Sequence, residues 1–232
     1  MSEKKVGDNL KDKLKGTVNT LKSSVKDIKV PEILKKKDVD NSQQSFAMSG
    51  VLSTKCALQI IYYLMSVDGQ ITADEEEQYK ELGEGLDPDF DSNRQQITDE
   101  CRLQIAKVID PEDLYEVVRE GVEKAIDSSV ATEDSFITAR LLLWDLLTIA
   151  HADKQYNEVE KNLIKFIVRK LGIYKAVFLE MESTVLALDD IEKEIEWIKT
   201  TDRPYLVIEG MVNELEDRKQ VLFTGVKDLI TL

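Results

Sequence analysis

The chain is poor in the residues that most catalytic and metal centres use. Its 232 residues include one histidine, His151, and two cysteines, Cys56 and Cys101. Neither cysteine belongs to a CxxC pair or a Cys/His cluster, so a structural zinc site of the usual kind is not expected. Both are expected to be buried free thiols, as in a reducing compartment. Without a nucleophile beside a base or a glycine-rich phosphate loop, the chain is not expected to be an enzyme.

Proline, aromatic residues and long hydrophobic runs are also scarce. There are four prolines, and aromatic residues make up 6% of the chain. No hairpin signal is evident, while long stretches are rich in Leu, Ile, Ala, Glu and Lys, which favours helices. No apolar run reaches the roughly 18–20 residues that a membrane span needs, and the N-terminus lacks the apolar core of a signal peptide. An all-α cytoplasmic protein is therefore expected.

Basic residues are too few to balance the acidic ones. The formal net charge is −14. Residues 1–48 hold 11 Lys and 7 Asp or Glu, which gives +4, so residues 49–232 hold 20 basic and 38 acidic residues, which gives −18. A body this acidic argues against nucleic-acid binding. It suits divalent cations or basic protein partners, and simple solubility explains it equally well.

Residues 1–30 carry an apolar stripe from Val6 to Ile28, with lysines beside it. The steps of three and four residues keep the stripe on one helix face. This pattern is typical of an interfacial helix on an anionic membrane surface. A disordered tail, or a helix packed on the body or on a partner, would explain it too. Pro31 ends the pattern and residues 35–45 form a polar linker, so residues 1–48 are separated from an acidic helical domain over residues 49–232.

Helix start and stop signals divide this domain into about nine helices. The fold class is thus all-α, a compact bundle of about 7–9 helices with two pseudo-symmetric helix–turn–helix halves, in addition to the basic amphipathic N-terminal segment. The fifth helix has the most apolar face and is expected to be central. The expected ranges are 50–67, 73–85, 92–109, a fourth from Pro111 capped by Asp110, 133–152, 158–172, 174–187, 189–200, and a last helix from Pro204 that continues to the end or breaks at Gly225.

An Asp followed seven residues later by Glu occurs twice, about 85 residues apart. The pairs are Asp68 with Glu75 and Asp153 with Glu160. Each Glu lies three residues after a capping residue, as in a capping box, so the motif has a purely structural explanation. If the two copies pack face to face, however, their four carboxylates would supply oxygens to a hard cation such as Ca²⁺, Mg²⁺ or Mn²⁺.

These stretches resemble the tellurite-resistance TerB family over about residues 50–175. The resemblance rests on Ser66-Val-Asp-Gly69 with Glu75, and on Ile149-Ala-His-Ala-Asp153 with Glu160 and Lys170-Leu-Gly-Ile173. It implies a duplicated all-helical domain and an acidic divalent-cation site at Asp68, Glu75, Asp153 and Glu160. It also implies a role in bacterial tellurite or general stress response, beside membrane-associated partners. Lys154 in place of a glycine and His151 in place of a small residue depart from the family pattern.

Three functional hypotheses follow from the sequence. The first is a non-enzymatic, cation-responsive protein of the TerB type, with protein partners and with residues 1–30 at the inner face of the membrane. The second is a structural or adaptor protein whose repeated motifs are only helix caps. A metallohydrolase is a distant third. His151 is expected to be structural, at a helix C-terminus where an imidazolium suits the helix dipole.

Overall fold

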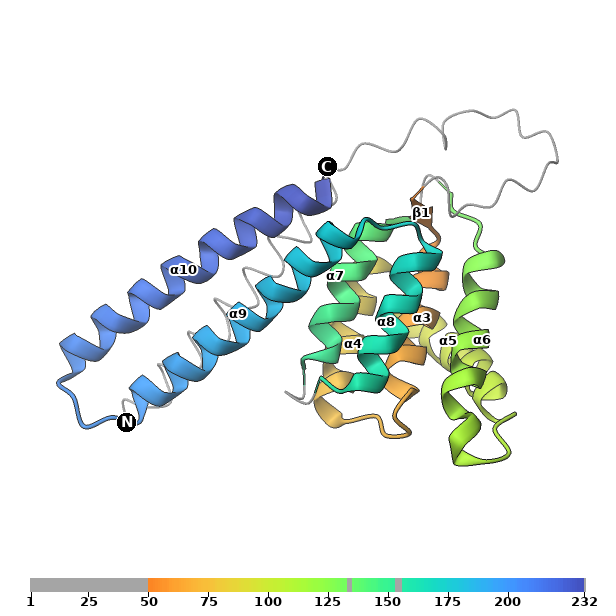
Figure 1. Ribbon diagram of the computed structural model, residues 1–232, viewed down its shortest axis with the longest axis horizontal. Helices are drawn as coiled ribbons and strands as arrows, with labels where there is room; N and C mark the ends of the chain where they lie inside the picture. The colour runs from red at the N-terminus through yellow and green to blue at the C-terminus, as the bar shows by residue number, and fades with distance from the viewer. Residues whose placement is uncertain (1–49, 133–134, 153–155, 232) are drawn as a thin grey trace.

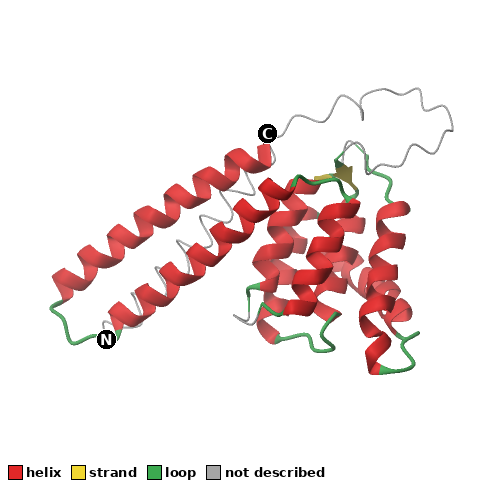
Figure 2. Cartoon of the chain, in the orientation of Figure 1, coloured by secondary structure: helices red, strands yellow, loops and turns green. Residues whose placement is uncertain are grey.

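The computed structural model describes residues 50–132, 135–152 and 156–231. The expected tail over residues 1–30, and Asp153 and Lys154 of the second motif, lie outside these ranges. The all-α prediction is confirmed, since the described residues form eight α-helices, one short 3-10 turn and a single pair of two-residue strands (Figure 2). The elements are β1 (Val51–Leu52), α3 (Thr54–Ser66), α4 (Ala73–Leu86), α5 (Phe90–Ile105), η2 (Pro111–Asp113), α6 (Leu114–Asp127), β2 (Ile137–Thr138), α7 (Ala139–Ala150), α8 (Glu158–Lys170), α9 (Lys175–Lys199) and α10 (Tyr205–Thr231).

The repeated unit is longer than the sequence motif and consists of strand, helix, turn and helix. β1, α3 and α4 form the first copy, and β2, α7 and α8 form the second. Ser53 and Thr138 cap α3 and α7, and Thr72 and Asn157 cap α4 and α8. Both pairs of caps are 85 positions apart, so the two copies keep one register from the strand to the second helix. This constant spacing supports an internal duplication.

The two copies pack against each other with approximate two-fold symmetry. β1 and β2 pair antiparallel, with Leu52 opposite Ile137, which are themselves equivalent positions. α3 packs along α7, and each also contacts the second helix of the other copy, α3 with α8 and α4 with α7. An antiparallel pair with equivalent residues face to face is the arrangement that a two-fold axis produces.

The hydrophobic core is centred on α3 and α7. Both helices are buried along almost their whole length, and the expectation of a central fifth helix is confirmed in α7, where Leu142, Leu146 and Leu147 are fully buried. That helix begins at Ala139 and not at residue 133, because the residues just before it form β2. α5 and α6 cover α3, while α9 and α10 contact α7 (Figure 1).

Several predicted boundaries are wrong. Residues 174–187 and 189–200 were expected to form two helices, but α9 is continuous because Ala187, Leu188 and Asp189 contain no breaker. In contrast, α10 runs through Gly225, which agrees with the first of the two alternatives expected there. Asp110 makes no capping hydrogen bond, and Pro111 starts the 3-10 turn η2 before α6. The third helix begins at Phe90, whose ring is buried in the core.

α9 and α10 form a helical hairpin that extends away from the bundle (Figure 1). Only the part near α7 shares the main core. Farther out, a separate small cluster of Ile195, Ile198 and Leu215 holds the two helices together. None of the helices in the described residues is long and apolar enough to cross a membrane.

Gly121 provides a test of the close packing between α6 and α3. A methyl group at this position would meet the Tyr63 ring within 2.6–2.9 Å, whereas one at Gly210 of α10 would meet nothing within 4 Å. We expect Gly121→Ala to lower the free energy of unfolding by about 1–3 kcal/mol, since overpacking shifts a buried ring. The matched Gly210→Ala should raise it by about 0.5–1 kcal/mol through helix propensity. Urea unfolding of both variants measures this, and equal effects would contradict the packing described.

Candidate functional site

The first Asp-to-Glu motif and the described part of the second, Tyr156 to Glu160, lie at the end of the bundle opposite the strand pair (Figure 1). In the first, α3 ends at Ser66 and Gly69 has a φ of +88°, a left-handed conformation that reverses the chain at no steric cost. Asp68 is exposed and its Oδ1 accepts a hydrogen bond from the Gln70 amide at 2.9 Å. This is an Asx turn, so one oxygen of the expected ligand already stabilises the loop.

The prediction of a capping box in each copy is confirmed. Glu75 Oε2 accepts hydrogen bonds from the Thr72 backbone amide at 2.8 Å and from its hydroxyl at 2.9 Å. Glu160 Oε2 accepts from the Asn157 amide at 2.9 Å, and Asn157 Oδ1 caps the Val159 and Glu160 amides. Both glutamates are only 5% exposed. One oxygen of each is therefore committed to starting a helix.

The two turns meet across the pseudo-two-fold. Asn157 Nδ2 donates to Asp68 Oδ2 at 3.4 Å, a contact between residues 89 positions apart. The sequence-based condition for a shared site, that the two turns lie next to each other, is thus met.

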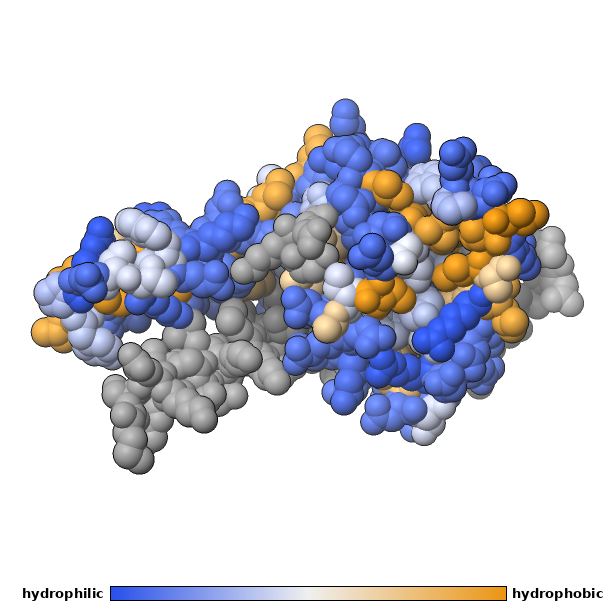
Figure 3. All heavy atoms as spheres, turned by 90° about the horizontal axis from the view of Figure 1, so that it is seen from below, coloured by the Kyte–Doolittle hydropathy of each residue, from blue (hydrophilic) through white to orange (hydrophobic). Residues whose placement is uncertain are grey.

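Figure 3 views the domain from this end and shows a mainly hydrophilic surface, with hydrophobic residues gathered on the side where α5 and α6 lie. Leu103 of α5 is 71% exposed, and Ile109, in the segment between α5 and η2, is 88% exposed.

The described carboxylates do not form a metal centre. Among residues 50–132, 135–152 and 156–231, no three His, Cys, Asp or Glu side chains are placed to hold an ion. Asp68, Glu75 and Glu160 each spend at least one oxygen on a hydrogen bond within the fold. The fourth expected ligand, Asp153, lies outside the described residues. The donor set on view therefore fits helix capping better than cation binding.

His151 has a partner that the sequence did not reveal. Its Nδ1 lies 2.8 Å from Asp189 Oδ2, its ring lies 4.4 Å from that of Tyr156, and it is only 7% exposed. Asp189 belongs to α9, 38 positions along the chain, and no local spacing could have identified it. Within the described part of the chain, His151 Nε2 is buried without a hydrogen-bond partner. The pair joins the second turn to the base of the hairpin.

A second polar group at this junction reinforces the attachment. The Tyr156 hydroxyl donates to Glu182 Oε1 at 3.1 Å, and Lys161 Nζ lies 3.4 Å from the same oxygen. Burial, followed by the charge of Glu182, raises the pKa of Tyr156 well above its ordinary value. The phenol therefore stays protonated as a donor over the physiological range. Glu182 and Asp189 together connect α9 to the turn that contains the second motif.

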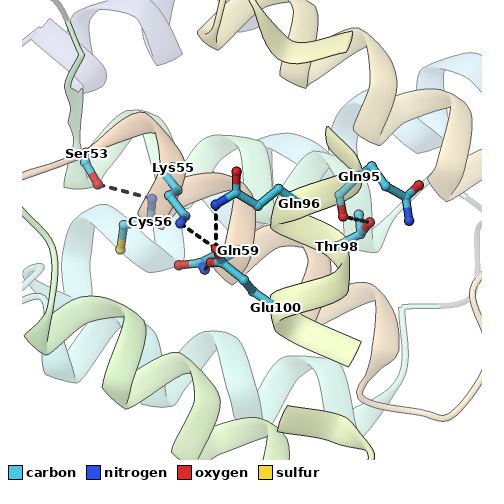
Figure 4. Close-up of polar contacts among 8 residues, drawn as sticks. All are labelled: Ser53, Lys55, Cys56, Gln59, Gln95, Gln96, Thr98 and Glu100. Carbon is cyan, nitrogen blue, oxygen red and sulfur yellow. Dashed lines mark hydrogen bonds and ion pairs between the residues drawn. The ribbon is translucent and has the colours of Figure 1, made fainter. Parts of the chain in front are cut away.

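Neither cysteine is suited to nucleophilic chemistry. The expectation of buried free thiols is confirmed, and burial raises the pKa of both Cys56 and Cys101 to about 12. A thiolate is thus absent near neutral pH. Beside Cys56, Lys55 and Gln59 donate to Glu100 at 2.8 Å, as Figure 4 shows. The hydrogen bond from Lys55 is the main cause that lowers the pKa of Glu100, so this cluster is a structural link between α3 and α5.

No family model matches this chain, and neither a curated protein nor a solved structure resembles it significantly.

The hydrogen bond between the two turns predicts that Asp68 and Asn157 are energetically coupled in unfolding. We expect Asn157→Ala to cost about 1 kcal/mol of unfolding free energy through the lost cap. Thr72→Ala in the first copy is the matched control, with a similar cost. Combined with Asp68→Ala, the Asn157 variant should show a coupling energy of about 0.5 kcal/mol in a double-mutant cycle, and the Thr72 variant should show a smaller one. Identical coupling in both cycles would contradict a specific link between the copies.

Proposed function

We propose that this chain is a non-enzymatic helical adaptor whose repeated motifs serve the fold and whose surface binds other macromolecules. The observation that supports this proposal is the burial and helix-capping role of the two motif glutamates, Glu75 and Glu160. Each is buried and holds the start of a helix with one oxygen. Capping is a sufficient explanation of the motif, and the two cysteines of the core are protonated thiols.

The biological setting of the adaptor is proposed from the resemblance to the TerB family. The stretches that carry it include Asp68 with Glu75 and Lys170-Leu-Gly-Ile173, and they imply a role in tellurite or general stress response beside membrane-associated partners. The duplicated helical architecture is compatible with this proposal. The apolar stripe of residues 1–30 and the lysines beside it would add contact with anionic lipid.

A divalent-cation protein is the second candidate, and the contact between the turns favours it. Asp68 Oδ2 accepts a hydrogen bond from Asn157 of the other copy. The first helical turns of α4 and α8, which follow the two loops, contain further acidic residues. Mg²⁺ often retains several waters and takes only one or two carboxylates from the protein. A cation here would bridge the two turns and hold the two repeats in a fixed relation.

Calorimetric titration with Ca²⁺, Mg²⁺ and Mn²⁺ separates these two candidates. The adaptor proposal expects no saturable heat for the unmutated protein. Glu75→Gln with Glu160→Gln keeps an acceptor at each capping position, so the thermal midpoint should fall by only a few degrees. Saturable binding that this double variant abolishes, and that the exposed control Asp74→Asn with Glu158→Gln retains, would establish the cation candidate and overturn the first.

Flotation with phosphatidylglycerol vesicles tests the role of residues 1–30. We expect the intact chain to float and a chain without residues 1–30 to stay at the bottom, because the body is strongly acidic and anionic lipid repels it. Raising the salt concentration should weaken the flotation of the intact chain. Equal flotation of both chains would end the proposal of a membrane-binding tail.

A further inference from the structure

A groove beside the second repeat combines apolar and basic residues on a body whose net charge is −18. It has a volume of about 940 Å³ and lies between α8 and the first turns of α9, with Tyr115 of α6 at its border. Val159 and Leu179, which are 39% and 47% exposed, contribute apolar surface, and Phe178 forms part of the wall. A concave apolar surface of this size is typical of a binding site.

The groove is also where unpaired positive charge gathers. Lys161 is paired with Glu182. In contrast, within the part of the chain that the structure describes, no carboxylate lies within 4.0 Å of the charged nitrogens of Lys165, Arg169 or Lys175. Over residues 49–232 as a whole, acidic residues outnumber basic ones by almost two to one, so three unpaired cations at one groove differ from the average composition of the body.

The spacing of the cations matches a helix. Lys161, Lys165 and Arg169 follow each other at four-residue intervals on α8, which places them in a row of about 12 Å at 1.5 Å per residue. Acidic residues at four-residue intervals on a second helix would repeat with the same period. The apolar residues of the groove lie beside this row, as an amphipathic helix would require.

We propose that this groove binds an amphipathic helix of a partner protein, with a leucine-rich face between flanking acidic residues. The proposal rests on the adaptor role and names the chemistry of its partner. Charge complementarity decides the occupant: the chain's own residues 1–48 carry a net charge of +4 and would be repelled by the cations. A partner helix with an acidic rim gains apolar burial, charge contacts with Lys165 and Arg169, the two unpaired cations of the row, and a further one with Lys175 at the start of α9.

The test uses the full chain and a labelled synthetic helix. The probe is a stapled 16-residue peptide with leucines at helical spacing and glutamates beside them, and the matched probe has glutamine at every glutamate. Fluorescence anisotropy should show saturable binding of the acidic probe, weakened about tenfold by Lys165→Glu with Arg169→Glu, which corresponds to about 1.4 kcal/mol. The control, Lys193→Glu with Lys199→Glu on the hairpin, changes the net charge equally and should alter binding less than about twofold.

Three outcomes of the peptide experiment would overturn the assignment. These are no saturable binding of the acidic probe, equal binding of the glutamine probe, or equal loss in the groove variant and the hairpin control. If the groove variant instead loses flotation with phosphatidylglycerol vesicles while keeping peptide affinity, the groove is a lipid site and the proposal fails. If the acidic probe does not bind, the adaptor proposal is unaffected, because the cation titration decides that proposal.

Discussion

The packing of α3 against α7 is the interaction on which the rest of the structure depends. These two equivalent helices have almost no exposed face, so each must be covered by several others. Burial of apolar surface stabilises by roughly 25 cal/mol per Å², and most residues of both helices belong to the main hydrophobic core. Because the helices are related by the duplication, their packing also fixes everything attached to their ends: the strand pair at one end and the two turns at the other.

The position of the turns explains why the motif resembles a site while serving the fold. A buried helix that ends must reverse the chain, and the next helix must start with its amide groups satisfied. Asp68 with Gly69 reverses the chain, and Thr72 with Glu75 satisfies the amides. The symmetry then brings a second set of these polar residues alongside. Acidic residues near one another at such a place follow from duplication and capping alone, and a ligand is an additional hypothesis.

The sequence predicted what depends on short spacing and missed what depends on distant contacts. The capping boxes, the buried thiols and a central helix, expected over 133–152 and found as α7, all follow from local pattern or apolar content. The pairing of β1 with β2 was missed because two-residue strands carry no periodicity. The contact of His151 with Asp189 was missed since it joins helices 38 positions apart. The duplication led us to expect that the two turns could lie together, but the particular contact of Asp68 with Asn157 was not predicted.

The two repeats differ in the helices that pack against them, which breaks the symmetry of the duplication. α5 and α6 pack on α3 of the first repeat, and α6 also contacts α8 of the second. The second repeat is followed by α9, which packs on α7 and leaves the bundle as one side of the hairpin. Buried polar contacts from Glu182 and Asp189 attach that helix to the second turn. α8 thus has one flank that lines the groove, with unpaired cations beside apolar residues. Duplicated halves that started alike have acquired different neighbours, and the proposed recognition surface lies where the neighbours of the second copy, α6 and α9, leave a groove beside α8.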